Sequence, residues 1–478
     1  MSFAKIYTRG LLGLHAPQIE VEVHISSGLP SLTIVGLAEA AVRESKDRVR
    51  SAIINSGFLF PTKRLTINLA PADLPKDGSR LDLPIALGIL IASGQLPENC
   101  TDGFEFIGEL ALDGHLRPVT GILPIAMACQ QAQHRLLVPT NNLEEANQLP
   151  QFEVYAANHL QDVCAHFLGT SHLSASPKHE NLTTTQYQFD LADVKGQLRP
   201  RRALEIAAAG GHSLLFKGPP GTGKTLLASR LPSILPPLNA QENLEVASIY
   251  SVANAQHTFG QRPFRAPHHT ASAIALVGGG SQPKPGEITL AHLGVLFLDE
   301  LPEFDRKVLE VLRQPLESKE IVISRAARQM TFPANFQFIA AMNPCPCGYA
   351  FNQDSRCQCS AENIQRYQNR ISGPLLDRID LHIDVPPLQT KELQDQSPTE
   401  SSTIVRQRVM KAYDKQMLRQ QCLNQALSPN LLEQYAQLDE NSAKIIEMAQ
   451  QRLNLSARAY HRVLRVARTI ADLAESEI

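Results

Sequence analysis

The chain has 478 residues, of which 43% are hydrophobic and 19% charged, and its 45 basic and 47 acidic residues give a formal net charge of −2. This composition excludes wholesale disorder and a uniformly basic nucleic-acid binder, although a local basic groove is compatible with a balanced total. Because Trp is absent and aromatic residues make up 5%, a platform of aromatic rings that stack on bases is a poor candidate. The length predicts two to four domains.

The first block, residues 1–168, mixes strand and helix patterns. Alternating apolar residues predict strands over 19–23 and 64–69, and apolar positions at helical spacing predict a helix over 39–56. This mixture indicates an α/β or α+β domain. The following residues, 169–188, are rich in Ser, Thr, Asn and His and are expected to form an exposed linker.

The chain shows no targeting or membrane pattern. Residues 1–23 lack the basic start and long apolar core of a secretory signal. The longest apolar run, 83–92, contains Pro84 and Gly88 and is too short to span a bilayer. We therefore expect a soluble, cytoplasmic protein.

The rest of the chain divides into two further blocks. Over 189–388, short apolar strands alternate with helices, which predicts a parallel sheet. Over 389–478, after a polar stretch, the pattern is almost entirely helical. Three arginines lie along the last helix, at Arg462, Arg465 and Arg468. For Arg462 and Arg465 the alternative to a function is a solvated helix face.

A phosphate-binding motif stands in the central block. The apolar residues 214–217 precede Gly-x-x-x-x-Gly-Lys-Thr, and a helix pattern over 226–231 follows. In such a motif the backbone N–H groups surround phosphate oxygens, Lys224 neutralises the β- and γ-phosphates, and the Thr225 hydroxyl binds Mg²⁺. The alternative is a Gly/Pro-rich turn with a chance lysine. The predicted ATP-binding residues are Gly218, Pro219, Pro220, Gly221, Thr222, Gly223, Lys224 and Thr225.

Two more apolar runs end in polar residues. The first, 294–298, is followed by Asp299, predicted to hold Mg²⁺ through water, and by Glu300, predicted to polarise the attacking water. The second ends in Asn343, which would contact the γ-phosphate and help to place the water; the alternative is an Asn that caps a turn before Pro. Together with the phosphate-binding motif, the Asp-Glu strand predicts an ATP hydrolase.

Further motifs carry a family resemblance. Phe-Arg-Ala-Pro-His-His-Thr-Ala-Ser at 264–272, the glycines 278–280 and Pro-Gly-Glu-Ile at 285–288 resemble the magnesium-chelatase-like branch of the AAA+ ATPases. More narrowly, the whole chain resembles the ComM/YifB-like family. The resemblance implies a central AAA+ P-loop domain at 189–388 and a C-terminal helical lid at 389–478.

The resemblance also implies an assembly. Such AAA+ modules form rings, commonly homo-hexamers, with ATP between subunits. Arg378 occupies the arginine-finger position and would reach the neighbouring subunit's γ-phosphate, with an ion pair to Asp377 or Asp380 as the alternative. Arg458 matches the sensor-2 arginine of the lid, which contacts the nucleotide.

Four of the eight cysteines cluster in a C-x-C…C-x-C pattern within an insertion at 345–359. Four thiolates can bind Zn²⁺ tetrahedrally and stabilise a loop that is too polar to fold alone. Free thiols are the alternative, and a catalytic metal is not indicated because no open coordination position is implied. The predicted zinc ligands are Cys345, Cys347, Cys357 and Cys359.

The N-terminal block resembles the Lon-protease fold in residues 75–79, 108–110 and 114–121. In the peptidase pattern a further Pro separates Pro-Lys-Asp-Gly from the nucleophilic serine, whereas here Ser79 follows directly. The expected lysine base is also missing, because Ile125 stands near its place. We therefore predict a catalytically inactive Lon-protease-like α+β domain, used for assembly or DNA contact.

Two insertions are predicted to line the pore of a ring. One is the loop 278–285, and the other is a hairpin of strands 321–324 and 329–332 with a basic turn. Repeated around a hexamer, their cations would follow phosphates with steep salt dependence and little base specificity; the alternative is a solvated basic hairpin. The predicted DNA-binding residues are Lys284, Lys319, Arg325 and Arg328.

Three functions are compatible with these residues. By resemblance, the first is a hexameric ATP-driven DNA motor, a branch-migration helicase that extends heteroduplex DNA during natural transformation and recombination. Its partners would be single-stranded and branched DNA, and a recombinase is a further candidate partner. The second is a chelatase-like or protein-remodelling ATPase that does not act on DNA. The third is an inert nucleotide-binding scaffold.

Overall fold

The chain divides into two units. The first comprises residues 1–183 and 244–259, and the second comprises residues 184–243 and 260–478. The computed structural model describes residues 3–36, 40–74, 76, 78–176, 187–280, 283–325, 328–350, 356–389, 392, 394, 399–453 and 455–476. Much of the predicted linker, 177–186, lies outside the described residues. In the described part, no helix is both long and apolar enough to cross a bilayer.

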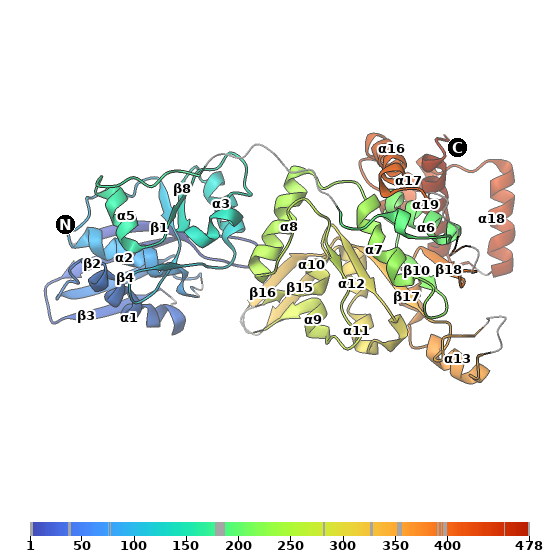
Figure 1. Ribbon diagram of the computed structural model, residues 1–478, viewed down its shortest axis with the longest axis horizontal. Helices are drawn as coiled ribbons and strands as arrows, with labels where there is room; N and C mark the ends of the chain where they lie inside the picture. Colours follow the sequence, from blue (N-terminus) through green and yellow to red (C-terminus); the bar gives the residue numbers. More distant parts are fainter. Residues whose placement is uncertain are drawn as a thin grey trace. The chain divides into compact units, whose positions relative to one another are not determined.

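A mixed sheet forms the first unit (Figure 1). Among the described residues it has seven strands in the order β3-β4-β2-β1-β5-β8-β9. Strand β2 pairs antiparallel with β1 and β4, whereas β1, β5, β8 and β9 run parallel in succession. The strands are β1 (Phe3–Arg9), β2 (Gln18–Ser26), β3 (Ser31–Val35), β4 (Arg64–Ala70), β5 (Phe104–Phe106), β8 (Arg135–Pro139) and β9 (Val154–Ala157), with a separate pair β6 (Glu109–Leu110) and β7 (Leu116–Arg117).

Helices complete the core of this unit. All residues of α2 are buried, and a Cβ at Gly88 would lie 2.6 Å from Val23 Cγ2, so the glycine allows α2 to pack closely on β2. The long apolar run is therefore a core helix, and the predicted mixture of strands and helices is confirmed. The helices are α1 (Ala40–Asn55), η1 (Ser79–Leu81), α2 (Asp82–Ala92), α3 (Ile122–Gln131), η2 (Thr140–Asn142), α4 (Leu143–Ala146) and α5 (Leu160–Phe167).

A parallel sheet forms the centre of the second unit, as predicted. Five strands in the described part follow the order β11-β14-β17-β10-β18, and every neighbouring pair is parallel. Because the strands are parallel, all their carboxyl ends meet at one edge of the sheet. The strands are β10 (Leu214–Lys217), β11 (Phe264–Arg265), β14 (Val295–Leu298), β17 (Gln337–Met342) and β18 (Leu381–Asp384).

Helices pack against this sheet through a common apolar core. Leu204, Leu227 and Val409 from three helices share one buried cluster with Phe216 and Ile339 of the sheet. The described helices before the C-terminal block include η3 (Leu191–Asp193), α6 (Leu198–Gly210), α7 (Lys224–Ile234), α9 (Ala273–Val277), α10 (Glu287–Leu290), η4 (Leu301–Glu303), α11 (Arg306–Glu310), α12 (Arg313–Ser318), α13 (Ala361–Gln368) and α14 (Gly373–Leu376), while α8 (Ala240–Ala253) passes from one unit into the other.

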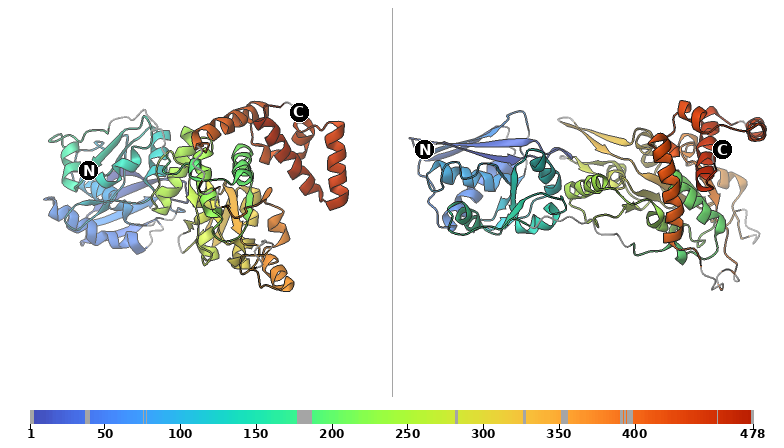
Figure 2. Two further views of the ribbon diagram at one scale, coloured as in Figure 1. Left: turned by 45° about the vertical axis from the view of Figure 1, so that its right-hand side comes forward. Right: turned by 90° about the horizontal axis from the view of Figure 1, so that it is seen from above.

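The C-terminal block is helical, as the sequence predicts. Figure 2 shows α16 and α19 beside the sheet domain, with α18 standing apart from it. None of the 14 residues of α18 is buried, whereas α19 buries Leu464, Arg468, Thr469 and Asp472. The elements are α16 (Ser402–Gln420), η5 (Asn424–Ala426), α17 (Pro429–Tyr435), α18 (Glu440–Leu453) and α19 (Ala457–Leu473).

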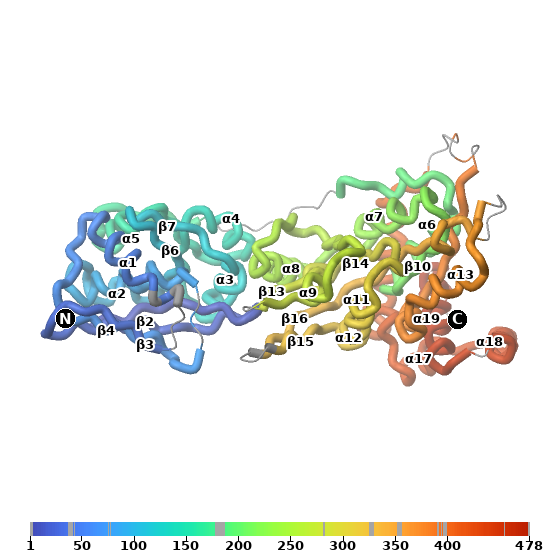
Figure 3. Tube along the Cα trace, turned by 90° about the horizontal axis from the view of Figure 1, so that it is seen from below, coloured from blue at the N-terminus to red at the C-terminus, as the bar shows by residue number. Residues whose placement is uncertain are grey.

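Two hairpins project from the second unit, and Figure 3 shows the longer one as an arm next to α12. The longer one, β15 (Glu320–Arg325) with β16 (Arg328–Pro333), confirms the predicted hairpin. The shorter pairs β12 (Gly278–Gly279) with β13 (Lys284–Pro285). A Cβ at Gly278 would lie 3.0 Å from Ile323 Cδ1, so the two predicted pore insertions contact each other.

Candidate nucleotide site

The predicted phosphate-binding loop leaves the carboxyl end of β10 and enters α7. Gly221 and Gly223 have φ angles of 76° and 87°, and a Cβ at either would meet nothing within 4 Å, so the loop faces open space there. Gly218 is constrained differently, since its Cβ would lie 2.3 Å from the Val385 carbonyl oxygen. A glycine-rich turn that leads into an 11-residue helix presents backbone N–H groups to an anion.

The side chain of Lys224 lies within this loop. Its Nζ donates to the carbonyl oxygens of Gly218 at 2.7 Å and Pro219 at 2.8 Å, and to Asn343 Oδ1 at 3.1 Å. Burial lowers the pKa of Lys224, while the charges of Asp299 and Glu300 act in the opposite direction. The ammonium group is therefore held at the loop by neutral acceptors, which phosphate oxygens can replace.

The two predicted magnesium ligands lie together. Thr225 Oγ1 donates to Asp299 Oδ2 at 2.5 Å, and Asp299 Oδ1 accepts from the Glu300 N–H at 2.9 Å. Asp299 follows the last residue of β14, so the parallel sheet brings its carboxylate to the same edge as the loop. A hydroxyl and a carboxylate are hard oxygen donors of the kind that Mg²⁺ binds. The donor set fits this ion.

Glu300 is in a left-handed backbone conformation, with φ of 53°. Its Oε2 lies 3.1 Å from Nδ1 of His269, whose ring lies 4.1 Å from that of His268 between centroids. The sequence motif that contains these histidines served above only as a family signature. Sequence reasoning missed His269 as a neighbour of Glu300, although the paired histidines were a signal that could have suggested it.

Another side chain contacts the loop without having been predicted. Gln197, which precedes α6, is 6% exposed and donates from Nε2 to the carbonyl oxygens of Pro386 at 2.8 Å and Thr222 at 3.3 Å. It connects the loop to the chain that follows β18. No local pattern marks this glutamine, since both partners are distant in sequence.

Arg378 lies at the opposite edge of the sheet from the phosphate-binding loop. In the parallel register Leu214 pairs with Leu381 and Lys217 with Asp384, so the loop follows one end of this strand pair and Arg378 precedes the other. The strand itself spans about 10 Å. The guanidinium pairs with Glu317 at 2.6 Å and not with a neighbouring aspartate, so the ion-pair alternative named the wrong acidic partner.

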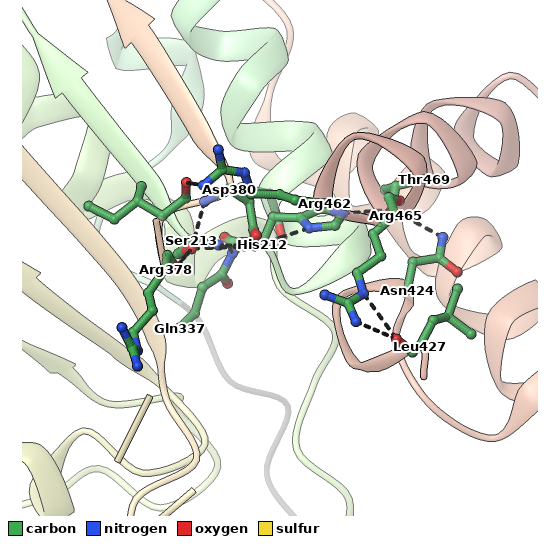
Figure 4. Close-up of polar contacts among 12 residues, drawn as sticks. His212, Ser213, Gln337, Arg378, Asp380, Asn424, Leu427, Arg462, Arg465 and Thr469 are labelled. Atoms are coloured by element: carbon green, nitrogen blue, oxygen red, sulfur yellow. Dashed lines mark hydrogen bonds and ion pairs between the residues drawn. The ribbon is translucent and has the colours of Figure 1, made fainter. Parts of the chain in front are cut away.

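The four arginines considered on the last helix, α19, have different hydrogen-bond partners. Arg458 Nη2 lies 3.1 Å from Oε1 of Glu317, the same oxygen that Arg378 contacts. Arg462 donates to the carbonyl oxygens on either side of Arg378, and Arg465 donates twice to the Leu427 carbonyl (Figure 4). The solvated-face alternative is therefore wrong for Arg462 and Arg465. Arg468 is buried against Asp472.

The four clustered cysteines converge. The Sγ–Sγ distances are 3.3 Å for Cys345–Cys347, 3.8 Å for Cys345–Cys357 and 3.6 Å for Cys347–Cys357. When Cys359 is included, all four sulfur atoms lie within 4.8 Å of one another. A tetrahedral Zn²⁺ with Zn–S bonds of about 2.3 Å places its sulfurs about 3.8 Å apart. The set fits zinc and is too open for disulfides. Residues 351–355 of the insertion lie outside the described residues.

The predicted DNA-binding residues lie on the two hairpins and at the end of α12. Lys284 is exposed on β13, whereas the side chains of Arg325 and Arg328 lie outside the described set, although their backbones pair at the end of the hairpin. Lys319 ends α12 at the other end of the hairpin with φ of 61°, and it lines a cavity of about 460 Å³ with Tyr413. Burial lowers the pKa of Lys319.

In the N-terminal unit, the residues that resemble the Lon-protease motifs do not form a serine–lysine pair in the contacts given below. Ser79 Oγ donates to a carboxylate oxygen of Glu109, and Ile125 is fully buried in α3. Lys76 is buried and donates to the Pro71 carbonyl. In these contacts the serine hydroxyl has a carboxylate neighbour and not a lysine base.

A phosphate-binding loop at the edge of a parallel sheet, with Asp299, Glu300 and Asn343 following adjacent strands, defines a P-loop ATPase of the AAA+ type. Comparison with known proteins agrees. The family models described as magnesium chelatase, subunit ChlI, as subunit ChlI of Mg-chelatase, and as magnesium chelatase, subunit ChlI C-terminal match residues 190–393, 21–142 and 399–478.

Full-length relatives narrow the family. The chain is 50% identical to the competence protein ComM of Haemophilus influenzae over 481 residues, covering 99% of this chain and 94% of the relative. It is also 50% identical to the uncharacterized protein YifB of Escherichia coli K12 over 483 residues, covering 100% and 95%. Lon protease 2 of Bacillus subtilis is 25% identical over 178 residues, 34% of this chain and 32% of the relative. The chain belongs to the ComM/YifB family of magnesium-chelatase-like AAA+ ATPases.

Proposed function

We propose that this protein is a hexameric ATP-driven DNA motor, a branch-migration helicase that extends heteroduplex DNA during natural transformation and recombination. The single observation that carries the ATPase part is the contact of Thr225 with Asp299 beside Lys224 at the edge of the parallel sheet. Support for the DNA part comes from the relative named competence protein ComM and from the basic hairpin.

In this proposal each residue of the nucleotide site has one task. The backbone from Gly218 to Gly223 binds phosphate oxygens, and Lys224 neutralises their charge. Thr225 directly and Asp299 through water would hold Mg²⁺, which would shield the phosphates. Glu300 accepts a proton from the attacking water, while Asn343 orients that water.

The position of Arg378 supports the proposed ring. Because it lies at the opposite edge of the sheet from its own phosphate-binding loop, it needs a neighbouring subunit's nucleotide as its target. A guanidinium at that place stabilises the charge that develops on the transferred phosphoryl group. Arg458 lies against the same Glu317 oxygen, so we assign it to the same interface.

The DNA surface is assigned to the two hairpins. Their contact at Gly278 and Ile323 lets them form one projection, which carries Lys284 and ends in Arg325 and Arg328. Around a ring, these cations would track the phosphate backbone of single-stranded or branched DNA. The partly buried Lys319 would be a minor contributor at most, and a recombinase would be a separate partner.

The other parts are assigned supporting roles. We propose three domains, with a Lon-protease-like, proteolytically inactive module at 1–168, the AAA+ core at 189–388 and a helical lid at 389–478. In the cysteine cluster, Cys345, Cys347, Cys357 and Cys359 would hold a structural Zn²⁺. The matching Lon protease 2 relative supports the first assignment, and we place the protein in the cytoplasm.

A second candidate is a chelatase-like or protein-remodelling ATPase that does not act on DNA. The match of residues 190–393 to the magnesium chelatase family model favours it. The two proposals share the ATP site and differ in the polymer or partner that is moved.

Branch migration on a fluorescent three-way DNA junction tests the proposal. We expect strand exchange by the wild-type protein with ATP and Mg²⁺ and none by Lys224→Ala. Neutralising Arg325 and Arg328 together should weaken DNA binding and flatten its dependence on salt concentration, since each phosphate contact releases counterions. ATP hydrolysis without any DNA binding at low salt would favour the second candidate. Failure of the wild type to move the junction, with ATP hydrolysis intact, would reject the motor.

A further inference from the structure

We infer that Glu317 is a positioning residue that holds Arg378 and Arg458 as one unit directed at the neighbouring subunit's nucleotide. The inference rests on the proposed function, since it assigns a partner to the arginine finger. Oε1 of Glu317 accepts from Arg378 Nη2 at 2.6 Å and from Arg458 Nη2 at 3.1 Å. One carboxylate oxygen thus gathers two guanidinium groups from different elements.

The contact joins segments that are remote in sequence. Glu317 belongs to the last turn of α12, Arg378 follows α14, and Arg458 lies in the first turn of α19. Two guanidinium groups that contact the same oxygen atom are close enough to repel each other. In addition, a cation in the first turn of a helix interacts unfavourably with the helix dipole. The Glu317 carboxylate offsets both effects, so it permits an arrangement that the two arginines would not adopt alone.

The side chain of Arg378 is more enclosed than that of an arginine in an ordinary surface ion pair, although its partner Glu317 is 53% exposed. The Arg378 side chain is 10% exposed, and its Nη1 donates to the Pro374 carbonyl at 2.5 Å while its Nη2 binds Glu317. Most exposed ion pairs contribute little to stability because both partners stay solvated and mobile. Here the mostly buried guanidinium has a fixed direction, which suits a group that must meet a phosphate in one geometry.

The backbone around Arg378 is fixed as well (Figure 4). Ser213 Oγ donates to the Arg378 carbonyl at 2.8 Å, and Arg462 Nη1 donates to the carbonyl oxygens of Asp377 at 3.1 Å and Ile379 at 3.0 Å. Arg462 stands one helical turn after Arg458 on α19. The loop and the start of α19 are therefore attached at two places, one through Arg462 and one through Glu317.

A third attachment between the same loop and helix lies deeper. His212 contacts Asp380 Oδ2 through Nδ1 at 3.3 Å and Thr469 Oγ1 through Nε2 at 2.8 Å, and Figure 4 shows this bridge between the sheet and α19. The loop that carries Arg378 and the helix that carries Arg458 are thus joined at three places. Glu317 is the member of this set that contacts the two guanidinium groups themselves.

Glu317 leaves donors available for a phosphate. A guanidinium has five N–H donors. Among the described residues, Arg458 donates to Glu317 from one nitrogen, Nη2. Its remaining N–H groups can therefore bind a further acceptor. The carboxylate therefore positions Arg458 and leaves its other nitrogens available, whereas both terminal nitrogens of Arg378 already have a partner.

The first test is Glu317→Gln, which keeps the size and removes the charge. We expect kcat for ATP hydrolysis to fall on the order of 100-fold, the loss that a misplacement of about 1 Å can cause. The affinity for a fluorescent ATP analogue should stay unchanged, because the protomer's own phosphate-binding loop is intact. Glu317→Asp, which keeps the charge, should recover part of the rate. Glu362→Gln is the matched control, since it removes an exposed ion pair with Arg366 on the same unit.

The second test uses mixed assemblies. Lys224→Ala protomers cannot use ATP but have intact arginines, whereas Glu317→Gln protomers have an intact ATP site. Mixing them should give ATP hydrolysis well above the sum of the parents, because a Glu317→Gln site can then be completed by a Lys224→Ala neighbour. Lys224→Ala mixed with Arg378→Ala is the reference.

These outcomes separate the two proposals. Recovery in the reference mixture without recovery in the Glu317→Gln mixture would overturn the role of Glu317 and leave the shared ATP site standing. No recovery in either mixture would overturn the shared site itself. A Glu317→Gln variant that folds and hydrolyses ATP at the wild-type rate would also reject the inference.

Discussion

Oε2 of Glu300 lies 3.1 Å from Nδ1 of His269, so the predicted catalytic base has a partner from a motif that stands before it in the chain. The backbone at Glu300, two residues after the end of β14, is left-handed, with φ of 53°. A residue other than glycine in this conformation is uncommon and is often found where function requires it.

We predict that Glu300→Gln lowers kcat for ATP hydrolysis by at least about 100-fold, because a general base contributes that much or more. The KM for ATP should change little, since the phosphate-binding loop is untouched. Steady-state hydrolysis together with nucleotide binding measures both. Glu303→Gln, which loses an exposed ion pair with Arg370, is the control. An unchanged kcat in Glu300→Gln would remove this residue from the mechanism.

The cysteine cluster gives a prediction that is independent of activity. The purified protein should contain one Zn²⁺ per chain, measured by elemental analysis, and Cys345→Ser should lose it because the buried Cys345 supplies one of four thiolates. Cys100→Ser, outside the cluster, should retain the metal. Full zinc content in Cys345→Ser, or none in the wild type under reducing, metal-replete conditions, would contradict the assignment.

Gly348 connects this cluster to the phosphate-binding loop. Its φ is 87°, and a Cβ would lie 2.6 Å from Pro220 Cδ. We therefore predict that Gly348→Ala raises the KM for ATP several-fold and lowers the free energy of unfolding by about 1–3 kcal/mol through backbone strain and overlap.

The control for Gly348 isolates the strain. Gly94 also has positive φ, 74°, but a Cβ there would meet nothing within 4 Å. Gly94→Ala should lower stability without changing the KM for ATP. Zinc content should persist in Gly348→Ala. An unchanged KM in that variant would show that the close contact does not affect the nucleotide site.

Asp82 gives a pH dependence in the first unit. Its carboxylate is fully buried beside Arg48, and burial raises its pKa from 3.8 to about 6 against the opposing effect of that arginine. The folded chain then holds the proton more tightly than the unfolded chain. Protonated Asp82 therefore stabilises the folded chain at low pH. As the pH rises from about 4 to about 6, the free energy of unfolding falls by on the order of 3 kcal/mol.

Urea unfolding of wild type and Asp82→Asn at several pH values checks this sign. Asp82→Asn should lack this part of the decline, so its stability relative to wild type should increase between about pH 4 and pH 6. The control is Asp102→Asn, because Asp102 is exposed. A relative stability that is constant or falls over this interval would contradict the prediction.

The sequence predicted the elements whose signals are local. Lys224 and Thr225 follow a strand and begin a helix, and Asp299 and Asn343 follow apolar runs, so a parallel sheet was enough to expect them together. Local sequence patterns likewise predicted the hairpin and the C-terminal helices, and the structure confirms both.

Partners that depend on tertiary packing could not be predicted. Glu317 meets Arg378 and Arg458, which are 61 and 141 positions away, and nothing in its own neighbourhood distinguishes it from any helix-terminal glutamate. For Lys319 the local pattern pointed to the wrong surroundings. A lysine next to a basic hairpin suggested a cation that faces solvent. Its left-handed position at the end of α12 turns it into a cavity instead.

The position of Arg378 at the far edge of its own sheet has a consequence for enzyme assays. If each ATP site is completed by a second chain, activity per milligram is not a constant of the protein. It should rise as the protein concentration increases, level off when assembly is complete, and fall on dilution before the fold is lost. Dilution series followed by ATP hydrolysis and by light scattering should then show midpoints at the same concentration.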